Sequence, residues 1–232
     1  MFNSLKFLIT LSCLWLSAAT TAQQPQQPQR PQTMTFSYVD HPAMVNFIIP
    51  LIRDAYLKLG IKTEFVAQPS NRNLLLVDKN LLDGDVGYMR IVLAGYQNII
   101  TVEPALVSGI FTLLCKPGLK CTPAVLADAQ QTIVSTSVSK KGLDAGFPGE
   151  IHSQFYIVND LALIPKFIRN GRFDYAIYPT TEKELAQMDL TGLLYVKLFQ
   201  SDLYHVLHKK YAFMAPEISA ALTATLAQKK TK

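Results

Sequence analysis

An arginine closes a stretch of sequence that otherwise has the character of a buried strand. The residues LLDGDVGYMR, at 81–90, run from an acidic turn through a short apolar segment to Tyr88 and Arg90. Ligands of open α/β sheets lie beyond the carboxyl ends of the strands, so both side chains should face a cleft. A guanidinium matches a carboxylate through two hydrogen bonds. Arg90 is therefore predicted to contact an anionic ligand, the alternative being a surface ion pair with Glu103.

Polar and aromatic residues also follow the first two predicted strands. Tyr38, Asp40 and His41 stand at the end of the first strand, where an aromatic ring could stack on a solute. Arg72 comes near the start of a helix after the second strand, where it could add positive charge to the cleft. The alternatives are a core tyrosine with a solvated turn, and a solvated arginine in a first helical turn.

A segment rich in hydroxyl groups, STSVSK at 135–140, follows a strand in the second part of the chain. Hydroxyl groups and free backbone N–H groups at such a place suit a carboxylate or a phosphate. Ser137 and Ser139 are the predicted ligand contacts, the alternative being that both are ordinary turn residues.

Alternating strands and helices are predicted to position these residues. In the first part of the chain, strand, helix, strand, helix and strand follow one another at 34–39, 43–60, 62–68, 70–81 and 84–89. This order is typical of a largely parallel sheet flanked by helices. Pro50 lies inside the first helical pattern, so it predicts either a kink or a later start of that helix.

The second part of the chain shows the same alternation without a repeated sequence. Strands are predicted at 109–115, 131–137, 173–179, 193–199 and 203–210. Helices are predicted at 122–129, 158–171, 181–188 and 215–228. No flexible linker separates the two parts, so the expected fold class is α/β, with two modules that follow one another directly.

The order and spacing of these pieces resemble a periplasmic solute-binding protein of family 3, the class related to polar amino-acid binding proteins of ABC transporters. The matching pieces are IIPLIRDAYLKLGIKTEFVAQP, LLDGDVGYMR, VEPAL and LIPKFIRNGRFDYAIYP, and the resemblance covers residues 34–228. It implies a two-lobed (type II, Venus-flytrap) fold with mixed, mainly parallel sheets and a hinge of two connecting segments. Lobe 1 would comprise 33–107 and 200–232, and lobe 2 would comprise 108–199.

The resemblance also implies a mechanism and further site residues. Solute bound in the cleft shifts the hinge equilibrium toward closure, and a membrane partner then recognises the closed form. The family commonly places an arginine after the third strand, and Arg90 comes several residues earlier than in typical members. Its amino-acid binders usually end the strand that matches 173–179 on an acid that holds the ligand ammonium. Here that place is taken by Tyr178 and Pro179, which argues against an α-amino acid ligand.

The predicted function is capture of a small polar, carboxylate-bearing solute by a monomer that presents it to a membrane permease and needs no cofactor or metal. The alternative is a sensing protein that delivers its ligand-bound form to a membrane receptor. A secreted hydrolase is less favoured, because the histidines are scattered and no catalytic or phosphate-binding motif occurs. The formal net charge is +5 without a basic stripe, so nucleic acid is not an expected partner.

The first residues predict export to the periplasm. Residues 1–22 combine Lys6, an apolar run and small residues, as in a secretory signal peptide, with cleavage expected after Ala22. A membrane anchor is the alternative, but the apolar run is shorter than the about 20 residues that span a bilayer. Cys13 leaves lipoprotein processing as a further alternative. The residues at 23–33, which are rich in Gln and Pro, are expected to form a flexible segment.

Two cysteines remain beyond the predicted signal peptide, in the segment CKPGLKC. Cys115 and Cys121 flank a Pro-Gly turn, and in an exported protein such a close pair most simply forms a disulfide. The alternative is a redox-active or metal-binding pair, although the CxxC spacing that favours such chemistry is absent from the sequence.

Overall fold

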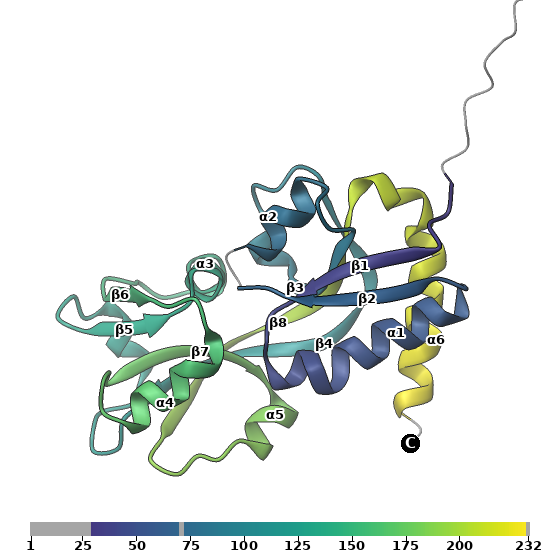
Figure 1. The fold of residues 1–232 in the computed structure, drawn as a ribbon. Helices are drawn as coiled ribbons and strands as arrows, with labels where there is room; N and C mark the ends of the chain where they lie inside the picture. The colour runs from purple at the N-terminus through teal and green to yellow at the C-terminus, as the bar shows by residue number, and fades with distance from the viewer. Residues whose placement is uncertain (1–28, 70–71, 231–232) are drawn as a thin grey trace, which may run out of the picture. The chain divides into compact units, whose positions relative to one another are not determined.

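The computed structural model describes residues 29–69 and 72–230, which Figure 1 draws as a coloured ribbon. The chain divides into the units Met1–Arg30 and Pro31–Lys232. In the first unit only residues 29 and 30 are described, and both are exposed.

The predictions made for the N-terminus fall mostly outside the described residues. This holds for the signal peptide at 1–22, for Cys13 and for most of the segment 23–33. Among the helices that are described, none is long and apolar enough to cross a membrane.

Three parallel strands form one end of the sheet. β1 (Thr33–Tyr38) pairs with β2 (Lys62–Ala67) on one side and with β3 (Gly84–Met89) on the other. Alternate side chains of β1 are buried in one core with residues of α1 (Ile49–Lys58) and α6 (Ala215–Lys230). These strands agree with the predicted ones to within one residue, because each combines strong β formers with clear turn residues at its ends.

The first helices are shorter than their apolar patterns. Pro50 occupies the first turn of α1, a position that proline favours. A π-helical turn, η1 (Met44–Ile48), precedes it, so the proline marks the later start that the sequence allowed. α2 (Asn73–Asp78) begins within the helix predicted at 70–81 and ends before its last residues.

Two long antiparallel strands connect the two ends of the sheet (Figure 1). β4 (Ile99–Cys115) pairs with β8 (Leu194–His208) along nearly all of its length, with a register shift between Val102 and Val107. The sequence predicted only the second part of β4, and it predicted β8 as two separate strands at 193–199 and 203–210. Both long strands continue through the segments where the connections were expected.

The other end of the sheet is again parallel. β5 (Thr132–Ser135) lies between β6 (Gln154–Ile157) and β7 (Tyr175–Thr181), and β7 pairs with β4. The helices here are α3 (Ser137–Gly146), α4 (Ile164–Arg169) and α5 (Glu182–Gln187). The sequence analysis missed α3 and β6. The helix predicted at 122–129 is a 3-10 turn, η3 (Pro123–Ala127).

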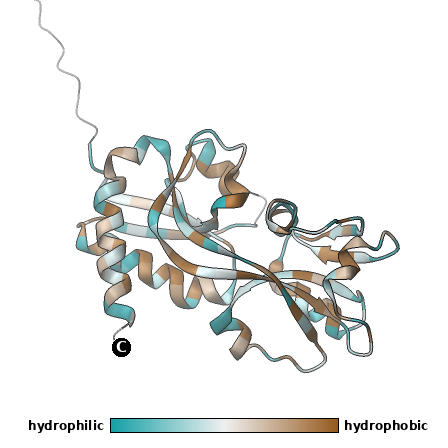
Figure 2. Ribbon diagram, turned by 180° about the vertical axis from the view of Figure 1, so that it is seen from behind, coloured by the Kyte–Doolittle hydropathy of each residue, from teal (hydrophilic) through white to brown (hydrophobic). Residues whose placement is uncertain are grey.

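The described residues form one eight-stranded sheet in the order β2-β1-β3-β8-β4-β7-β5-β6. We call the end formed by β1, β2 and β3 with α1, α2 and α6 the β1 half, and the end formed by β5, β6 and β7 with α3, α4 and α5 the β5 half. Each half has its own buried cores. Figure 2 shows hydrophobic segments on the long strands and on α1, as expected for elements that face these cores. The predicted α/β class with parallel and antiparallel strands is confirmed.

A disulfide joins Cys115, the last residue of β4, to Cys121, with the two sulfurs 2.03 Å apart. It closes the Pro-Gly loop beside one core of the β5 half. The predicted pairing is confirmed in preference to a free thiol pair.

Candidate ligand-binding site

A cavity lies where the carboxyl ends of the parallel strands from both halves meet. It encloses about 680 Å³ of atom-free space, including the part that is open to solvent. Residues that follow β1 and end β3 line it from the β1 half, and residues that follow β5 and end β7 line it from the β5 half. Ligand sites of open α/β sheets lie at such strand ends.

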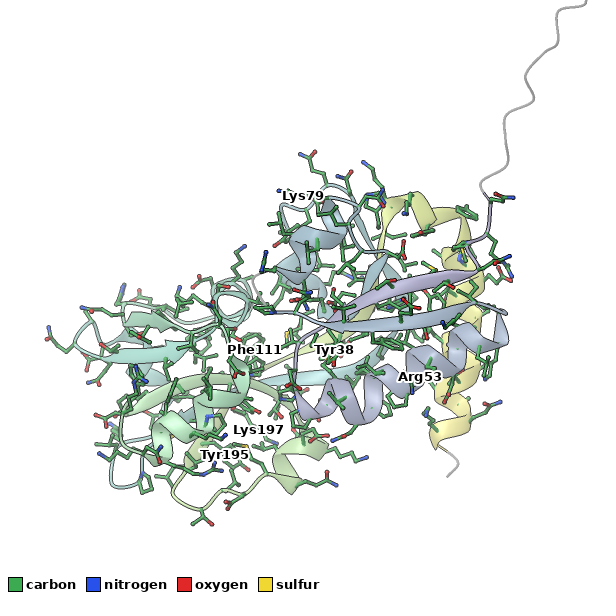
Figure 3. All side chains as sticks on the ribbon, viewed as in Figure 1. Tyr38, Arg53, Lys79, Phe111, Tyr195 and Lys197 are labelled. Carbon is green, nitrogen blue, oxygen red and sulfur yellow. A yellow bond between two sulfur atoms is a disulfide. The ribbon has the colours of Figure 1, made fainter. Side chains whose placement is uncertain are left out.

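Most of the lining is apolar. The apolar lining residues are Val39, Ala43, Met44, Met89, Val92, Phe111, Val138, Leu161, Pro179 and Leu203. Figure 3 labels Phe111, which lies on β4 and stacks on Phe199 of β8 with ring centroids 4.4 Å apart. The polar lining residues are His41, Tyr88, Thr136, Ser139, Thr180 and Thr181. Among the described residues that line the cavity there is no Asp, Glu, Lys or Arg.

His41 is held by the turn that follows β1. Its carbonyl oxygen accepts hydrogen bonds from the backbone N–H groups of Met44 and Val45, which begins the helical segment. The ring is only 5% exposed, and its Nδ1 accepts a hydrogen bond from the Ala43 N–H at 3.1 Å. Burial lowers the pKa of His41 to about 4, so the ring is neutral near neutral pH and carries its proton on Nε2. This Nε2 is buried and has no hydrogen-bond partner among the described residues.

The start of α3 brings hydroxyl groups to the cavity. Thr136 caps the helix, since its Oγ1 accepts a hydrogen bond from the Ser139 N–H at 3.1 Å. The hydroxyl oxygens of Thr136 and Ser139 are also 2.8 Å apart. Both residues are buried. Their hydroxyl groups hydrogen-bond to each other, and the Thr136 hydroxyl also bonds to the backbone at the start of α3.

The end of β7 forms the opposite wall with Pro179, Thr180 and Thr181. Thr181 caps α5 by accepting the Glu184 N–H at 3.2 Å. Tyr178 does not line the cavity; it is buried in a core of the β5 half, and its ring lies 5.6 Å from the His41 ring. Burial raises the pKa of the Tyr178 hydroxyl to about 12, so it stays protonated.

A buried acid lies directly behind the cavity wall. The Asp85 carboxylate accepts hydrogen bonds from Ser37 Oγ at 2.7 Å, Asn73 Nδ2 at 2.9 Å and the Gly87 N–H at 3.0 Å. Gly87 lines the cavity, whereas Asp85 does not. Burial raises the pKa of Asp85 to about 7, against the lowering effect of these hydrogen bonds. The sequence analysis placed Asp85 in an acidic turn and did not anticipate this burial.

The structure gathers some of the predicted contacts and separates others. His41, Tyr88 and Ser139 line the same cavity. Tyr38, labelled in Figure 3, is half-buried against the core of the β1 half. Asp40 lines a neighbouring depression with Gln68 and Asp160.

The remaining predicted contacts do not line the cavity. Ser137 is half-buried in the first turn of α3, and Arg72 is exposed at the start of α2. Arg90 forms an ion pair with Glu103, and its guanidinium lies 4.1 Å from the centre of the Tyr204 ring. Its side chain is 53% exposed. The surface pair that the sequence offered as the alternative is therefore the one observed.

Several lining residues were not predicted. Met44, Phe111 and Leu203 are themselves apolar, so their residue types gave no signal that they approach a ligand site. Thr136, Thr180 and Thr181 lie beside predicted contacts at strand ends, which is the signal that could have found them. For metals, residues 29–69 and 72–230 contain no group of three or more His, Cys, Asp or Glu that could hold an ion.

No protein-family model matches the chain, and no similar sequence was found among curated proteins. Solved structures do match. A variant of arginine-bound ArgBP from T. maritima matches with a TM-score of 0.67 at 11% identity, over 83% of this chain and 95% of that one. The GluR0 ligand-binding core from Nostoc punctiforme, in complex with L-glutamate, matches with a TM-score of 0.68 at 14% identity, over 87% and 95%.

A third structure is the amino acid ABC transporter substrate-binding protein AbpA from Streptococcus pneumoniae, bound to L-arginine. It matches with a TM-score of 0.65 at 11% identity, over 85% of this chain and 92% of that one. Together these likenesses show the fold. It is the mixed α/β fold of periplasmic binding proteins, of the type II found in amino-acid-binding proteins.

Proposed function

We propose that the protein is an extracytoplasmic solute-binding protein that captures a small molecule in the cavity and presents it to a membrane transporter. The cavity itself carries the proposal, because it is lined by strand ends of both halves. A ligand there would contact both halves at once and so favour their closed arrangement. In this proposal lobe 1 comprises 33–107 and 200–232, lobe 2 comprises 108–199, and the hinge lies where β4 and β8 pass between them.

The fold supports a periplasmic location and a transporter as the partner, since AbpA is a substrate-binding protein of an ABC transporter. The likeness to the GluR0 ligand-binding core favours a second candidate, in which the ligand-bound form acts on a membrane receptor. Both candidates use the same cavity and act as monomers, and they differ in the membrane protein that recognises the closed form.

The proposal ascribes no reaction to the cavity. Nucleophilic catalysis needs a nucleophile within hydrogen-bond reach of a base. His41 bonds to the Ala43 backbone, and its Nε2 has no hydroxyl or thiol partner among the described residues. The Ser139 hydroxyl pairs with Thr136 instead. The polar groups of the cavity are therefore arranged to contact a ligand rather than to attack it.

The predicted carboxylate on the ligand rested on Arg72 and Arg90. Neither arginine lines the cavity, and Arg90 is paired with Glu103. The proposal therefore keeps a small-molecule ligand and does not assign it a carboxylate.

A thermal-shift screen with a matched pair of variants tests the proposal. The purified protein is tested against amino acids, organic acids, amines, amides, peptides and sugars, because a ligand of the folded state raises the melting temperature with its concentration. Val138→Trp fills the cavity that Val138 lines, whereas Val45→Trp makes the same change at a position that is 42% exposed and outside the lining. We expect a hit that Val138→Trp abolishes and Val45→Trp keeps. A hit that survives Val138→Trp unchanged would place binding outside the cavity and contradict the proposal.

A further inference from the structure

We infer that the cavity takes an uncharged molecule with an apolar body and a hydrogen-bond acceptor, and that the Nε2–H of His41 donates to this acceptor. The inference rests on the proposed function, because it takes the cavity to be the ligand site. It separates this chain from the arginine- and glutamate-bound structures that share its fold.

The first observation is the donor. His41 is 5% exposed, and its Nδ1 is used by the Ala43 N–H at 3.1 Å. In the neutral ring the proton must then be on Nε2, which becomes a donor. That nitrogen belongs to a residue that lines the cavity, and no described residue accepts its hydrogen bond. A buried donor without a partner is unfavourable, so a ligand that supplies an acceptor gains the interaction that the protein lacks.

The second observation is the charge of the walls. Among the described residues that line the cavity there is no cation for a carboxylate and no anion for an ammonium. A charge buried without a partner is strongly unfavourable, and an amino acid zwitterion would bury two. Asp85, which bonds to the lining residue Gly87, already accepts hydrogen bonds from Ser37, Asn73 and the Gly87 N–H. When Asp85 is ionised, its negative charge repels an anionic ligand in the cavity.

The third observation is the shape and softness of the apolar lining. Phe111 offers a flat ring, and Met44 and Met89 offer unbranched side chains that are half-buried and can adapt to different ligand shapes. Val138, Leu161 and Leu203 complete an apolar surface around them. This lining favours a ligand whose body is apolar and whose polar atoms are few.

The test uses sets of probes that share one apolar body and differ in the polar group that it carries. Suitable sets are phenylacetamide, phenylacetate and 2-phenylethylamine; indole-3-acetamide, indole-3-acetate and tryptamine; and isovaleramide, isovalerate and isoamylamine. The amino acids phenylalanine, tryptophan and leucine complete each set. We expect the carboxamides alone to raise the melting temperature, and calorimetry to show carboxamides binding at least about tenfold more tightly than their charged partners.

Two variants of His41 test the donor. His41→Asn keeps an acceptor for the Ala43 N–H and removes the group at Nε2, whereas His41→Gln places an amide N–H near the Nε2 position. We expect His41→Asn to weaken carboxamide binding about tenfold, the effect of one buried hydrogen bond between neutral groups. His41→Gln should bind more tightly than His41→Asn. Melting curves without ligand show whether each variant is folded.

The outcomes separate the inference from the proposed function. A carboxylate, amine or amino acid that binds as tightly as its carboxamide would overturn the inference and leave a solute-binding protein in place. Equal carboxamide affinity in the wild type and in folded His41→Asn would overturn the role of His41. If no probe shifts the melting temperature of a cooperatively unfolding sample, the inference fails, and the proposed function is then decided by the wider thermal-shift screen with Val138→Trp.

Discussion

Two buried histidines of this chain are used in different ways. His205, on β8 in the core of the β1 half, has both ring nitrogens bonded, with Nδ1 2.9 Å from the Asp85 carbonyl oxygen and Nε2 2.8 Å from the Tyr56 hydroxyl. His41, beside the cavity, uses only Nδ1 in hydrogen bonds with the described residues. Burial lowers the pKa of each ring to about 4, so both are neutral near neutral pH.

The difference distinguishes a histidine that holds the fold together from one that is kept for a ligand. The His205 ring also contacts Phe36 edge-on, with ring centroids 5.1 Å apart, so every part of it is used by the core. A fully satisfied polar group of this kind specifies packing. His41 is also buried, at 5% exposed against 0% for His205, but its Nε2–H has no partner among the described residues. A buried polar group without a partner needs an explanation, and the inferred ligand supplies one.

The largest effect is expected from truncating each ring. His205→Ala leaves a hole in the core and strips partners from the Tyr56 hydroxyl and the Asp85 carbonyl, so the free energy of unfolding should fall by about 3–4 kcal/mol. His41→Ala should lower it by only about 1–2 kcal/mol, because the ring borders a cavity and gives up one hydrogen bond. Urea denaturation of both variants measures the difference. Equal losses would mean that the two rings are not used differently.

The pH dependence of stability should show what the two rings share. Each folded pKa, about 4, lies below the unfolded value of 6.5, so the unfolded chain binds more protons between these values. The stability that each ring contributes is present above pH 6.5 and is lost as the pH falls toward 4, roughly 2–3 kcal/mol per ring. Urea midpoints across this range should fall less steeply in His41→Gln than in the wild type. An unchanged slope would contradict a buried neutral His41.

Asp85 should act in the opposite direction. Its folded pKa of about 7 lies above the unfolded value of 3.8, so the folded state holds a proton that the unfolded state releases. The contribution is present below the unfolded pKa and is lost as the pH rises through about 7. Asp85→Asn removes this loss, so its stability relative to the wild type should grow by about 4 kcal/mol from acidic to neutral pH. A constant difference between the two proteins would show that folding does not shift the pKa of Asp85.

The smallest effect is expected at Arg90. Its ion pair with Glu103 is half-exposed and lies outside the cavity lining, so Arg90→Ala should change the free energy of unfolding by no more than about 1 kcal/mol. Lys62→Ala, which breaks the similarly exposed pair with Glu64, is the matched control. The melting-temperature shift produced by a bound carboxamide should be the same in both variants. If this melting-temperature shift disappeared only in Arg90→Ala, Arg90 would be a ligand contact after all.

The sequence predicted best where local and global signals agree. β3 lies at 84–89 as predicted, because a bend at 81–83 precedes it and its apolar residues Val86 and Tyr88 are buried. The helix α3 was missed because its sequence, SVSKKGLDAG, is rich in residues with weak helix propensity. Gly142 is there for packing, since a Cβ at this position would lie 2.5 Å from Phe111 Cζ. Such a contact between distant segments leaves no periodic pattern in the chain.

The sequence predicted where the candidate site lies, but not which side chains line it. Strand ends indicated His41, Tyr88 and Ser139, and these three residues line one cavity because the carboxyl ends of the parallel strands meet there. The sequence could not say which way a side chain turns at the end of a strand. The Arg90 side chain contacts Glu103 and Tyr204. It therefore no longer supports the anionic ligand that was inferred from its charge.

The most direct test of the account is the imidazole nitrogen NMR spectrum of the protein, recorded while the carboxamide with the largest melting-temperature shift is titrated to saturation. The chain has four histidines, so each ring can be assigned by substitution. The account predicts that the Nε2 resonance of His41 moves as it gains an acceptor, while both nitrogens of His205 stay unchanged. Saturation with a stationary His41 resonance would contradict the claim that this ring is kept for the ligand.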